Sequence, residues 1–375
     1  MINIKELIKY RRHLHKYPEI GFETTNTINF IFNEINNIDY NKDKIKLLIN
    51  KINNNLIVTL STKNSNILGF RADIDALEIK ETNNISYKST NNYMHACGHD
   101  AHTAISLRVI TYLLENPTIL NGTVRFIFQN AEEGPNEGGA FHLIENDLIK
   151  EITSIFALHV NSELEPFTIY YRYNEIMAQS NMFKIELFGK SSHITRFKEG
   201  IDVLKIGIKI YNKIMNLTKK DLIYIGKFNS GVSSNIVSEY TKIEGSIRTF
   251  HLQNYRYIYK KIGQIIKRYS KNNKYKISYN NGYPPVINNK QLTDLLINCS
   301  NNLNINIKYL KKPFLLSDDF SRYSVNSQIC YFFIGTKLNK NTPLHSSNFT
   351  INEDALKTGF DIFIELIKNY PFKYV

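Results

Sequence analysis

The 375-residue chain contains no tryptophan, only three cysteines and no run of 18 or more apolar residues. Three widely spaced cysteines, Cys97, Cys299 and Cys330, exclude a disulfide framework and favour a reducing compartment. Without a long apolar run a transmembrane helix is excluded. The opening residues carry charge in every turn and lack the apolar stretch of a secretory signal. These absences predict a cytoplasmic protein that does not bind membranes.

Positive charge exceeds negative charge by 13, with 47 Lys and Arg against 34 Asp and Glu. Such a balance is typical of proteins that bind nucleic acid or anionic surfaces. Here the lysines are scattered, and the only local basic stripe is Lys260, Lys261, Lys267 and Arg268 on one expected helix. Because no nucleic-acid-binding motif accompanies the charge, we expect no nucleic-acid partner. The 24 tyrosines and 22 phenylalanines are then expected to fill the core.

The first part of the chain alternates expected helices with expected strands. Apolar periodicity predicts helices at 4–16, 25–36 and 102–115, the second capped by Thr24 or Thr25. Strands are predicted at 56–60, 67–70, 123–128 and 154–158. This alternation predicts an α/β sheet with helices on both faces.

The pattern changes from about Gln179 onward. The predicted order becomes strand 182–188, helix 200–217, strands 223–229 and 237–249, helix 252–269 and strand 275–279. The alternation of helices and strands seen in the first part then resumes, with helix 290–303, strand 329–334 and helix 353–369. We therefore expect a helix-flanked mixed-sheet catalytic domain made of 1–178 and 287–375. Residues 179–286 would form an inserted, smaller α+β lid or dimerisation domain.

Acidic or histidine residues follow three of the expected strands: Asp73 and Asp75, Glu132 and Glu133, and His159. In open α/β sheets that edge binds ligands. The segment 95–102 adds three histidines, a thiol and a carboxylate, and leads into a helix whose N-terminus favours anions. Each cluster alone is more often a solvated turn or a hydrogen-bonded core residue. Together they predict a metal site, because converging like charges repel unless a cation or proton intervenes.

The types of donor atom narrow the choice of metal ion. Imidazole, carboxylate and one thiolate suit zinc, manganese, cobalt or nickel better than calcium or magnesium. Two metal ions need about five protein ligands and a shared water. Adjacent side chains such as Glu132 and Glu133 point in different directions, so one can bind metal while the other moves a proton. That division of labour suits amide hydrolysis.

Five motifs in this order resemble those of the di-metal amidohydrolases that include hippurate hydrolase and auxin–amino acid conjugate hydrolase. They are Arg11-Arg12-His13-Leu14-His15 with Pro18-Glu19, the run from Phe70 to Leu77, residues 94–102, Gln129 to Gly134, and Gly189-Lys190-Ser191-Ser192-His193. The resemblance covers essentially the whole chain. Within the group, the length, Tyr283-Pro284-Pro285-Val286 and the short C-terminus are most similar to N-acetyldiaminopimelate deacetylase.

The resemblance implies a role for each residue of the metal site. It implies two divalent ions bound by five ligands, with Cys97 bridging: Cys97, His99, Glu133, His159 and His345. Glu132 would be the general base that deprotonates the attacking water and later protonates the leaving amine. Either Asp73 or Asp75 would orient a ligand.

The resemblance also assigns the inserted domain to the substrate. His193 would stabilise the developing oxyanion, across a homodimer, while Asn235 and Arg248 would hold the substrate α-carboxylate. The implied reaction is hydrolysis of the amide bond of an N-acyl L-amino acid. Its most specific form converts N-acetyl-LL-2,6-diaminopimelate to diaminopimelate and acetate in lysine biosynthesis.

Two segments depart from the family pattern. Ile194 to Lys198 replaces the usual Ala-Ala-x-Pro-His, and Leu316-Ser317-Asp318-Asp319-Phe320 replaces the usual Gly-Glu-Asp-Phe. Both lie near the substrate in the family, so other readings stay open. These are a hippurate-type amidohydrolase, a carboxypeptidase or dipeptidase, and a non-catalytic metal-binding protein. His13 and His15 are expected to pack or hydrogen-bond structurally, and His102 to lie beside the ligands.

Overall fold

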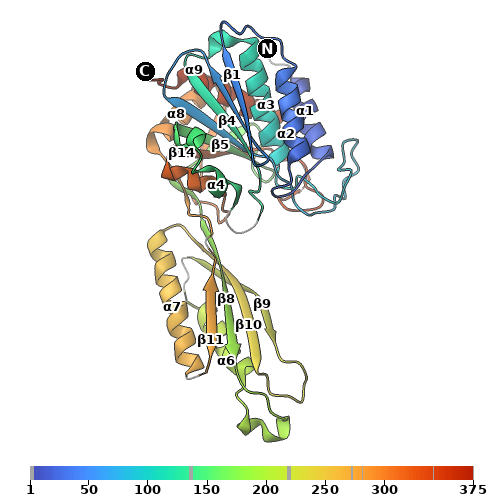
Figure 1. Ribbon diagram of the computed structural model, residues 1–375, viewed down its shortest axis with the longest axis vertical. Helices are drawn as coiled ribbons and strands as arrows, with labels where there is room; N and C mark the ends of the chain where they lie inside the picture. Colours follow the sequence, from blue (N-terminus) through green and yellow to red (C-terminus); the bar gives the residue numbers. More distant parts are fainter. Residues whose placement is uncertain are drawn as a thin grey trace. The chain divides into compact units, whose positions relative to one another are not determined.

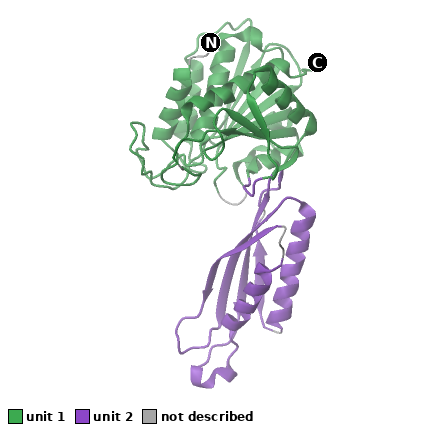
Figure 2. Ribbon diagram, turned by 180° about the vertical axis from the view of Figure 1, so that it is seen from behind, with its two compact units in different colours: residues 1–176, 287–313, 318–375 green, residues 177–286, 314–317 purple. Residues whose placement is uncertain are grey.

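The computed structural model describes residues 4–134, 138–217, 221–271, 273–280, 282–340 and 342–374. The chain divides into two compact units (Figure 2). Unit 1 contains the described residues of 1–176, 287–313 and 318–375, and unit 2 those of 177–286 and 314–317. The predicted fold class is confirmed: a large mixed sheet flanked by helices and a smaller sheet with its own helices. No helix in these described ranges combines the length and apolarity that a membrane span requires.

The sheet of unit 1 has eight strands in the order β1-β2-β4-β3-β5-β14-β6-β13. Its central strands β4, β3, β5 and β14 run parallel, β1 and β2 form an antiparallel edge, and β6 is antiparallel to β14 and parallel to β13. The strand bounds are β1 (Lys46–Ile52), β2 (Asn55–Ser61), β3 (Ile67–Asp73), β4 (Thr123–Gln129), β5 (Ile152–Asn161), β6 (Thr168–Tyr171), β13 (Asn306–Tyr309) and β14 (Gln328–Gly335).

Helix α3 (His99–Glu115) is the central helix of unit 1, and all its residues except Tyr112 and Glu115 are buried. It packs on β3 and β5 and is flanked by α1 (Ile4–Lys16), α2 (Thr25–Asn36) and α9 (Leu356–Asn369) (Figure 1). The other helices are α4 (Gly138–Leu143), α5 (Asp147–Lys150) and α8 (Lys290–Asn302). The predicted start of α3 at residue 102 is wrong by one turn, because its first turn buries polar side chains and so lacks apolar periodicity.

Glu19 supplies the cap of α2 that the sequence assigned to a threonine. Thr24 occupies the N-cap position but its side chain makes no capping hydrogen bond. Instead the Glu19 carboxylate accepts the backbone N–H groups of Asn26 (3.1 Å) and Thr27 (2.7 Å). A negative charge at a helix N-terminus is favourable, so this contact fixes the segment between α1 and α2.

Unit 2 is a four-stranded sheet in the order β11-β8-β10-β9 with two helices packed on it. Alternate residues of the strands, such as Ile185 and Ile243, are buried against helix residues such as Ile210 and Ile262. The bounds are β8 (Gln179–Phe188), β9 (Leu222–Ser230), β10 (Tyr240–Thr249), β11 (Tyr275–Tyr279), α6 (Val203–Met215) and α7 (Leu252–Ser270). The short strands β7 (Asn174–Met177) and β12 (Val286–Asn288) pair with each other.

Phe70 lies in the middle of the unit 1 core. Its ring is fully buried and lies 4.6 Å from the ring of Phe363, 5.2 Å from Phe126 and 6.2 Å from Phe156, between centroids. Truncating Phe70 to alanine is expected to lower the free energy of unfolding by about 3–5 kcal/mol, because a cavity replaces a buried ring. Urea denaturation measures this loss. Val325→Ala, at a side chain 70% exposed, is the control and should change it by less than about 0.5 kcal/mol. Equal losses in the two variants would contradict the packing.

Candidate metal centre

Three neighbouring strands carry the acidic and histidine residues to one edge of the large sheet. Asp73 is the last residue of β3, Glu132 and Glu133 follow β4, and His159 lies on β5. Because the order is β4-β3-β5 and the strands are parallel, these side chains converge. The expectation that His159 follows its strand is wrong. The strand β5 continues to Asn161, since β14 pairs with it through Gly335.

A glycine turn brings the segment 95–102 to the same edge. Gly98 has φ +93°, and a Cβ there would approach Val160 Cγ2 to 2.4 Å, so only glycine fits. The turn places Cys97 just before α3 and His99 at the first position of α3. Cys97 Sγ lies 3.4 Å from His159 Nε2.

Two histidines present the same ring nitrogen to the centre. The Nδ1–H of His99 donates to the carbonyl of Asp75 (2.8 Å), and that of His159 donates to the carbonyl of Val160 (2.6 Å). Each contact leaves Nε2 as the atom available for a ligand bond. His99 Nε2 is buried without a hydrogen-bond partner among the described residues. An unsatisfied buried nitrogen costs about 1–3 kcal/mol, which a metal bond would offset.

The donor atoms form two groups that share the cysteine. Cys97, His99 and His159 form one group and Cys97, Glu133 and His345 the other, with the donor atoms of each within 4.8 Å of one another. His345 Nε2 lies 3.0 Å from Glu133 Oε1, and its backbone N–H donates to the carbonyl of Ala96 (2.9 Å). His345 adopts φ +61°, an uncommon conformation outside glycine that is found at ligand-holding sites. This donor set fits two metal ions that share a thiolate.

Asp73, the last residue of β3, and Asp75, two residues later, make different contacts. The Asp75 carboxylate accepts the backbone N–H groups of Glu132 (3.1 Å) and Glu133 (3.0 Å), which follow the left-handed Ala131 at φ +53°. The Asp73 carboxylate instead accepts from His102 Nδ1 (2.6 Å) and from Arg71 (2.7 Å). Since His102 Nε2 accepts the backbone N–H of Val160 (3.0 Å), both ring nitrogens of His102 are used by the protein.

The electrostatics of the site favour a cation. Burial raises the pKa of Glu132 well above its usual range, and Asp318 and Glu133 raise it further. Burial likewise raises the pKa of the Cys97 thiol, with Glu133 and Glu132 adding to the effect. Burial also acts to raise the pKa of Glu133, but His345 and His99 outweigh it and the net shift is downward. A divalent cation would favour the charged forms of all three groups at once.

A buried arginine network behind the donors was missed by the sequence analysis. Arg71 lies 2.8 Å from Asp319 and 3.3 Å from Asp318, and the carboxylates of Asp318, Asp319 and Glu132 approach within 4.8 Å of one another. Burial raises the pKa of Asp319 to about 7, with Arg71 opposing it. The acid pair Asp318-Asp319 stands out in the sequence as a departure from the family pattern, but no local pattern links it to Arg71.

The three predicted substrate residues lie in unit 2, at two ends of its sheet. His193 bridges to Ile236, and the N–H of Ile194 donates to the carbonyl of Asn235 (3.0 Å), so His193 and Asn235 are neighbours. Arg248 pairs with Ser180 at the far end of β10. The step from Tyr240 to Arg248 alone spans roughly 26 Å at about 3.3 Å per residue. The fold therefore does not bring Asn235 and Arg248 together within one chain.

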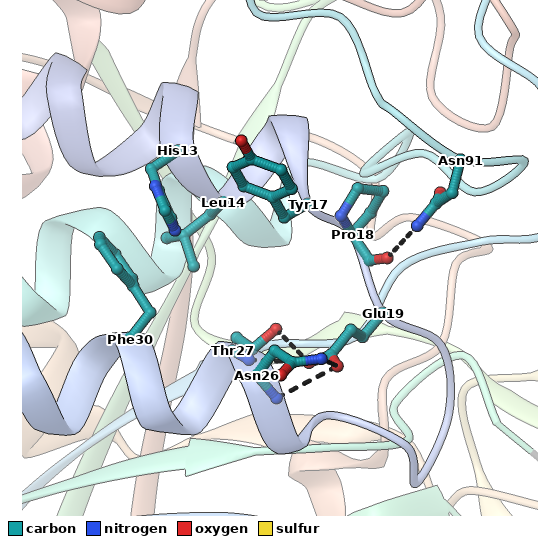
Figure 3. A pocket seen from close by; sticks show the side chains of 9 residues that line it. All are labelled: His13, Leu14, Tyr17, Pro18, Glu19, Asn26, Thr27, Phe30 and Asn91. Atoms are coloured by element: carbon teal, nitrogen blue, oxygen red, sulfur yellow. Dashed lines mark hydrogen bonds between the residues drawn. The ribbon is translucent and has the colours of Figure 1, made fainter.

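A separate pocket of about 380 Å³ lies between α1 and α2 (Figure 3). Its walls include His13, Tyr17, Glu19, Phe30 and Asn91, and the His13 ring stacks on Phe30 at 3.8 Å between centroids. His13 therefore faces this pocket, and none of the predicted metal ligands is among the described residues that line it.

Comparisons with known proteins agree with this geometry. An "Uncharacterized hydrolase" of Staphylococcus epidermidis is 32% identical, covering 96% of this chain and 97% of its own. "Thermostable carboxypeptidase 1" of Saccharolobus solfataricus is 30% identical, covering 94% of this chain and 92% of its own. The crystal structure of a Bacillus subtilis protein described as a dinuclear metal-binding peptidase of the M20 family superposes with a TM-score of 0.84 at 26% identity, covering 97% of each chain.

The model of the family described as peptidase family M20/M25/M40 matches residues 69–369, which is most of the chain. The match includes both donor groups and Glu132. This chain therefore belongs to peptidase family M20/M25/M40 and is a metal-dependent hydrolase.

Proposed function

We propose that the protein hydrolyses the amide bond of an N-acyl L-amino acid. The observation that supports this most directly is the pair of donor groups that share Cys97, with Glu132 beside them. Cys97, His99, Glu133, His159 and His345 would hold two divalent ions, for which manganese, zinc, cobalt and nickel are suitable. When bound, the ions polarise the scissile carbonyl and make the attacking water more acidic.

Glu132 would move the proton. Glu132 is 8% exposed and one of its carboxylate oxygens lies 3.9 Å from His99 Nε2, so the carboxylate reaches the space between the donors. Burial raises its pKa, which favours a group that accepts a proton from water and returns it to the leaving amine nitrogen. Asp75 holds the backbone of Glu132 and Glu133 and, through its carbonyl, His99. We therefore assign the orienting role to Asp75 rather than Asp73.

The narrower substrate proposal is N-acetyl-LL-2,6-diaminopimelate, in lysine biosynthesis, and it rests on the resemblance of the sequence motifs. The second candidate is a carboxypeptidase acting on peptides. Its support is the 30% identity to a relative named thermostable carboxypeptidase 1 over almost the whole chain. Both reactions break an amide bond next to an α-carboxylate, so the same centre serves either.

We propose a homodimer because the predicted substrate residues lie at opposite ends of the sheet of unit 2. In the proposed roles His193 stabilises the oxyanion while Asn235 and Arg248 hold the carboxylate, yet Arg248 lies a sheet length away from the other two. A second copy that supplied His193 and Asn235 would resolve this. The surface near His193 is also apolar: Val232 is 91% exposed and Phe197 57% exposed. Exposed apolar surface of this kind is typical of protein interfaces.

Glu132→Gln tests the proposed base. Because the amide cannot take up a proton, kcat should fall by about 10²- to 10⁴-fold while two metal ions stay bound. Steady-state kinetics and elemental analysis measure the two quantities. Glu163→Gln, at an exposed glutamate just after β5, is the matched control and should leave both unchanged. A Glu132→Gln enzyme with near-normal kcat would show that another group moves the proton.

Metal removal tests the centre and the substrate together. Dialysis against a chelator should abolish activity, and adding manganese, cobalt, zinc or nickel should restore it. The reconstituted enzyme is then assayed on acetyl, benzoyl and peptidyl amino acids. Highest kcat/KM on acetyl-diaminopimelate supports the deacetylase, and preference for free peptides supports the carboxypeptidase. Fewer than one bound ion per chain after reconstitution would argue against both.

Mixing two inactive variants tests the shared site. In a heterodimer of Glu132→Gln and His193→Ala chains, one site has both intact residues if His193 acts across the interface. Equal mixing with subunit exchange should then restore ~25% of wild-type activity. Zero recovery, despite heterodimers seen by native mass spectrometry, contradicts a shared site.

A further inference from the structure

Two polar residues of the N-terminal motif are buried but have no part in the proposed chemistry. Arg11 and His15 lie on the inner face of α1 and are 0% exposed, as is their partner Asp100. Buried charges persist only when they are paired and hydrogen-bonded, so this cluster is a built feature of the fold. It also lies partly outside the family match, which begins at residue 69.

The cluster makes two sets of contacts, which we call its arms. The first arm runs through Asp100 to the segment that bears Cys97 and His99. Asp100 directly follows His99 in the first turn of α3. Its Oδ2 accepts from Arg11 Nε (2.8 Å) and lies 2.8 Å from His15 Nδ1, and its Oδ1 accepts the N–H of Ala101 (2.9 Å). Because Asp100 and His99 share a peptide unit, these contacts fix the direction in which α3 begins.

The second arm leads to the segment that bears His345. His15 Nε2 lies 3.3 Å from Glu81 Oε1, which also accepts from the side-chain amide of Asn83 (3.0 Å). That amide donates in turn to the carbonyl of Phe349 (2.9 Å). The N–H of Thr82 donates to the carbonyl of Ser347 (2.8 Å). The segment 81–83 therefore holds the chain two to four residues beyond His345.

We propose that His15 is a positioning residue that holds the two ligand-bearing segments in register. Its two ring nitrogens contact one carboxylate of each arm, Asp100 and Glu81. Without it, the segments of His345 and Cys97 would keep the hydrogen bond from the His345 N–H to the Ala96 carbonyl (2.9 Å) but lose the link through His15, and the second donor group would loosen. This role rests on the proposed metal centre. Residues that orient metal ligands commonly change metal affinity by about 10- to 100-fold when replaced.

The chain offers a matched control two residues away. His13 is on the same helix but stacks on Phe30 and faces the pocket (Figure 3). His15→Leu removes both contacts, whereas His13→Leu removes ring contacts with Phe30 and Tyr17. An asparagine amide reaches the position of Nδ1 and a glutamine amide that of Nε2. His15→Asn therefore keeps the Asp100 arm, and His15→Gln keeps the Glu81 arm.

The test measures Co²⁺ stoichiometry and dissociation constants on the full chain, by competition with a chelating indicator. His15→Leu should bind at least one ion about 10- to 100-fold more weakly, His13→Leu should match wild type, and the asparagine or glutamine variant should recover part of the loss. Wild-type affinity in His15→Leu, or an equal loss in His13→Leu, overturns the proposal. If His15→Leu does not fold, wild-type affinity for both ions in His15→Asn and His15→Gln overturns it. A wild-type chain that binds no Co²⁺ contradicts the metal centre itself.

Discussion

The structure depends on the burial of several carboxylates and one thiol where the parallel strands at the centre of the large mixed sheet end. Asp73, the last residue of β3, meets Glu132 and Glu133, which follow β4, because β3 and β4 are neighbours. Carboxylates that meet inside a protein repel one another unless a proton or a cation intervenes. Arg71 neutralises the rear of the cluster through Asp318 and Asp319, while the front is lined by histidines whose Nε2 atoms face Cys97 or Glu132. A metal cation would bind at that front, beside the carboxylates of Glu132 and Glu133.

The rest of unit 1 holds this edge in place. Asp75 uses its carboxylate for the Glu132–Glu133 backbone and its carbonyl for His99, so one residue couples two strands to α3. From the N-terminal side, the carbonyls of Glu19 and Gly21 accept the N–H groups of Ala76 (2.7 Å) and Ala131 (3.0 Å), which adjoin Asp75 and Glu132. The uncommon backbone of Ala131 and His345 is held by such contacts. Hydrogen bonds to the backbone beside the donors thus fix the geometry of the ligands.

Much of the fold and of the candidate site could be predicted from the sequence, because apolar periodicity and local motifs carry that information. The α/β architecture followed from the alternation of strands and helices, and the convergence at the ends of β3 and β4 from the acidic residues placed there. What could not be predicted depends on register and backbone direction. His159 lies inside β5 because β14 pairs with it through Gly335, and the start of α3 at His99 shows no apolar periodicity because its first turn is polar and buried. The pairing of Asp318 and Asp319 with Arg71 joins residues about 250 positions apart, which no local pattern reveals.

We propose that two metal ions share the thiolate of Cys97, because both donor groups include this residue. X-ray absorption spectroscopy at the zinc edge of the fully loaded protein tests it most directly. Each zinc should show one sulfur neighbour at about 2.3 Å, and a second metal at about 3.5–4 Å. A Cys97→Ser protein should lose the sulfur neighbour from both ions together. Zinc bound without sulfur, or a sulfur neighbour on only half of the zinc, would contradict a shared Cys97.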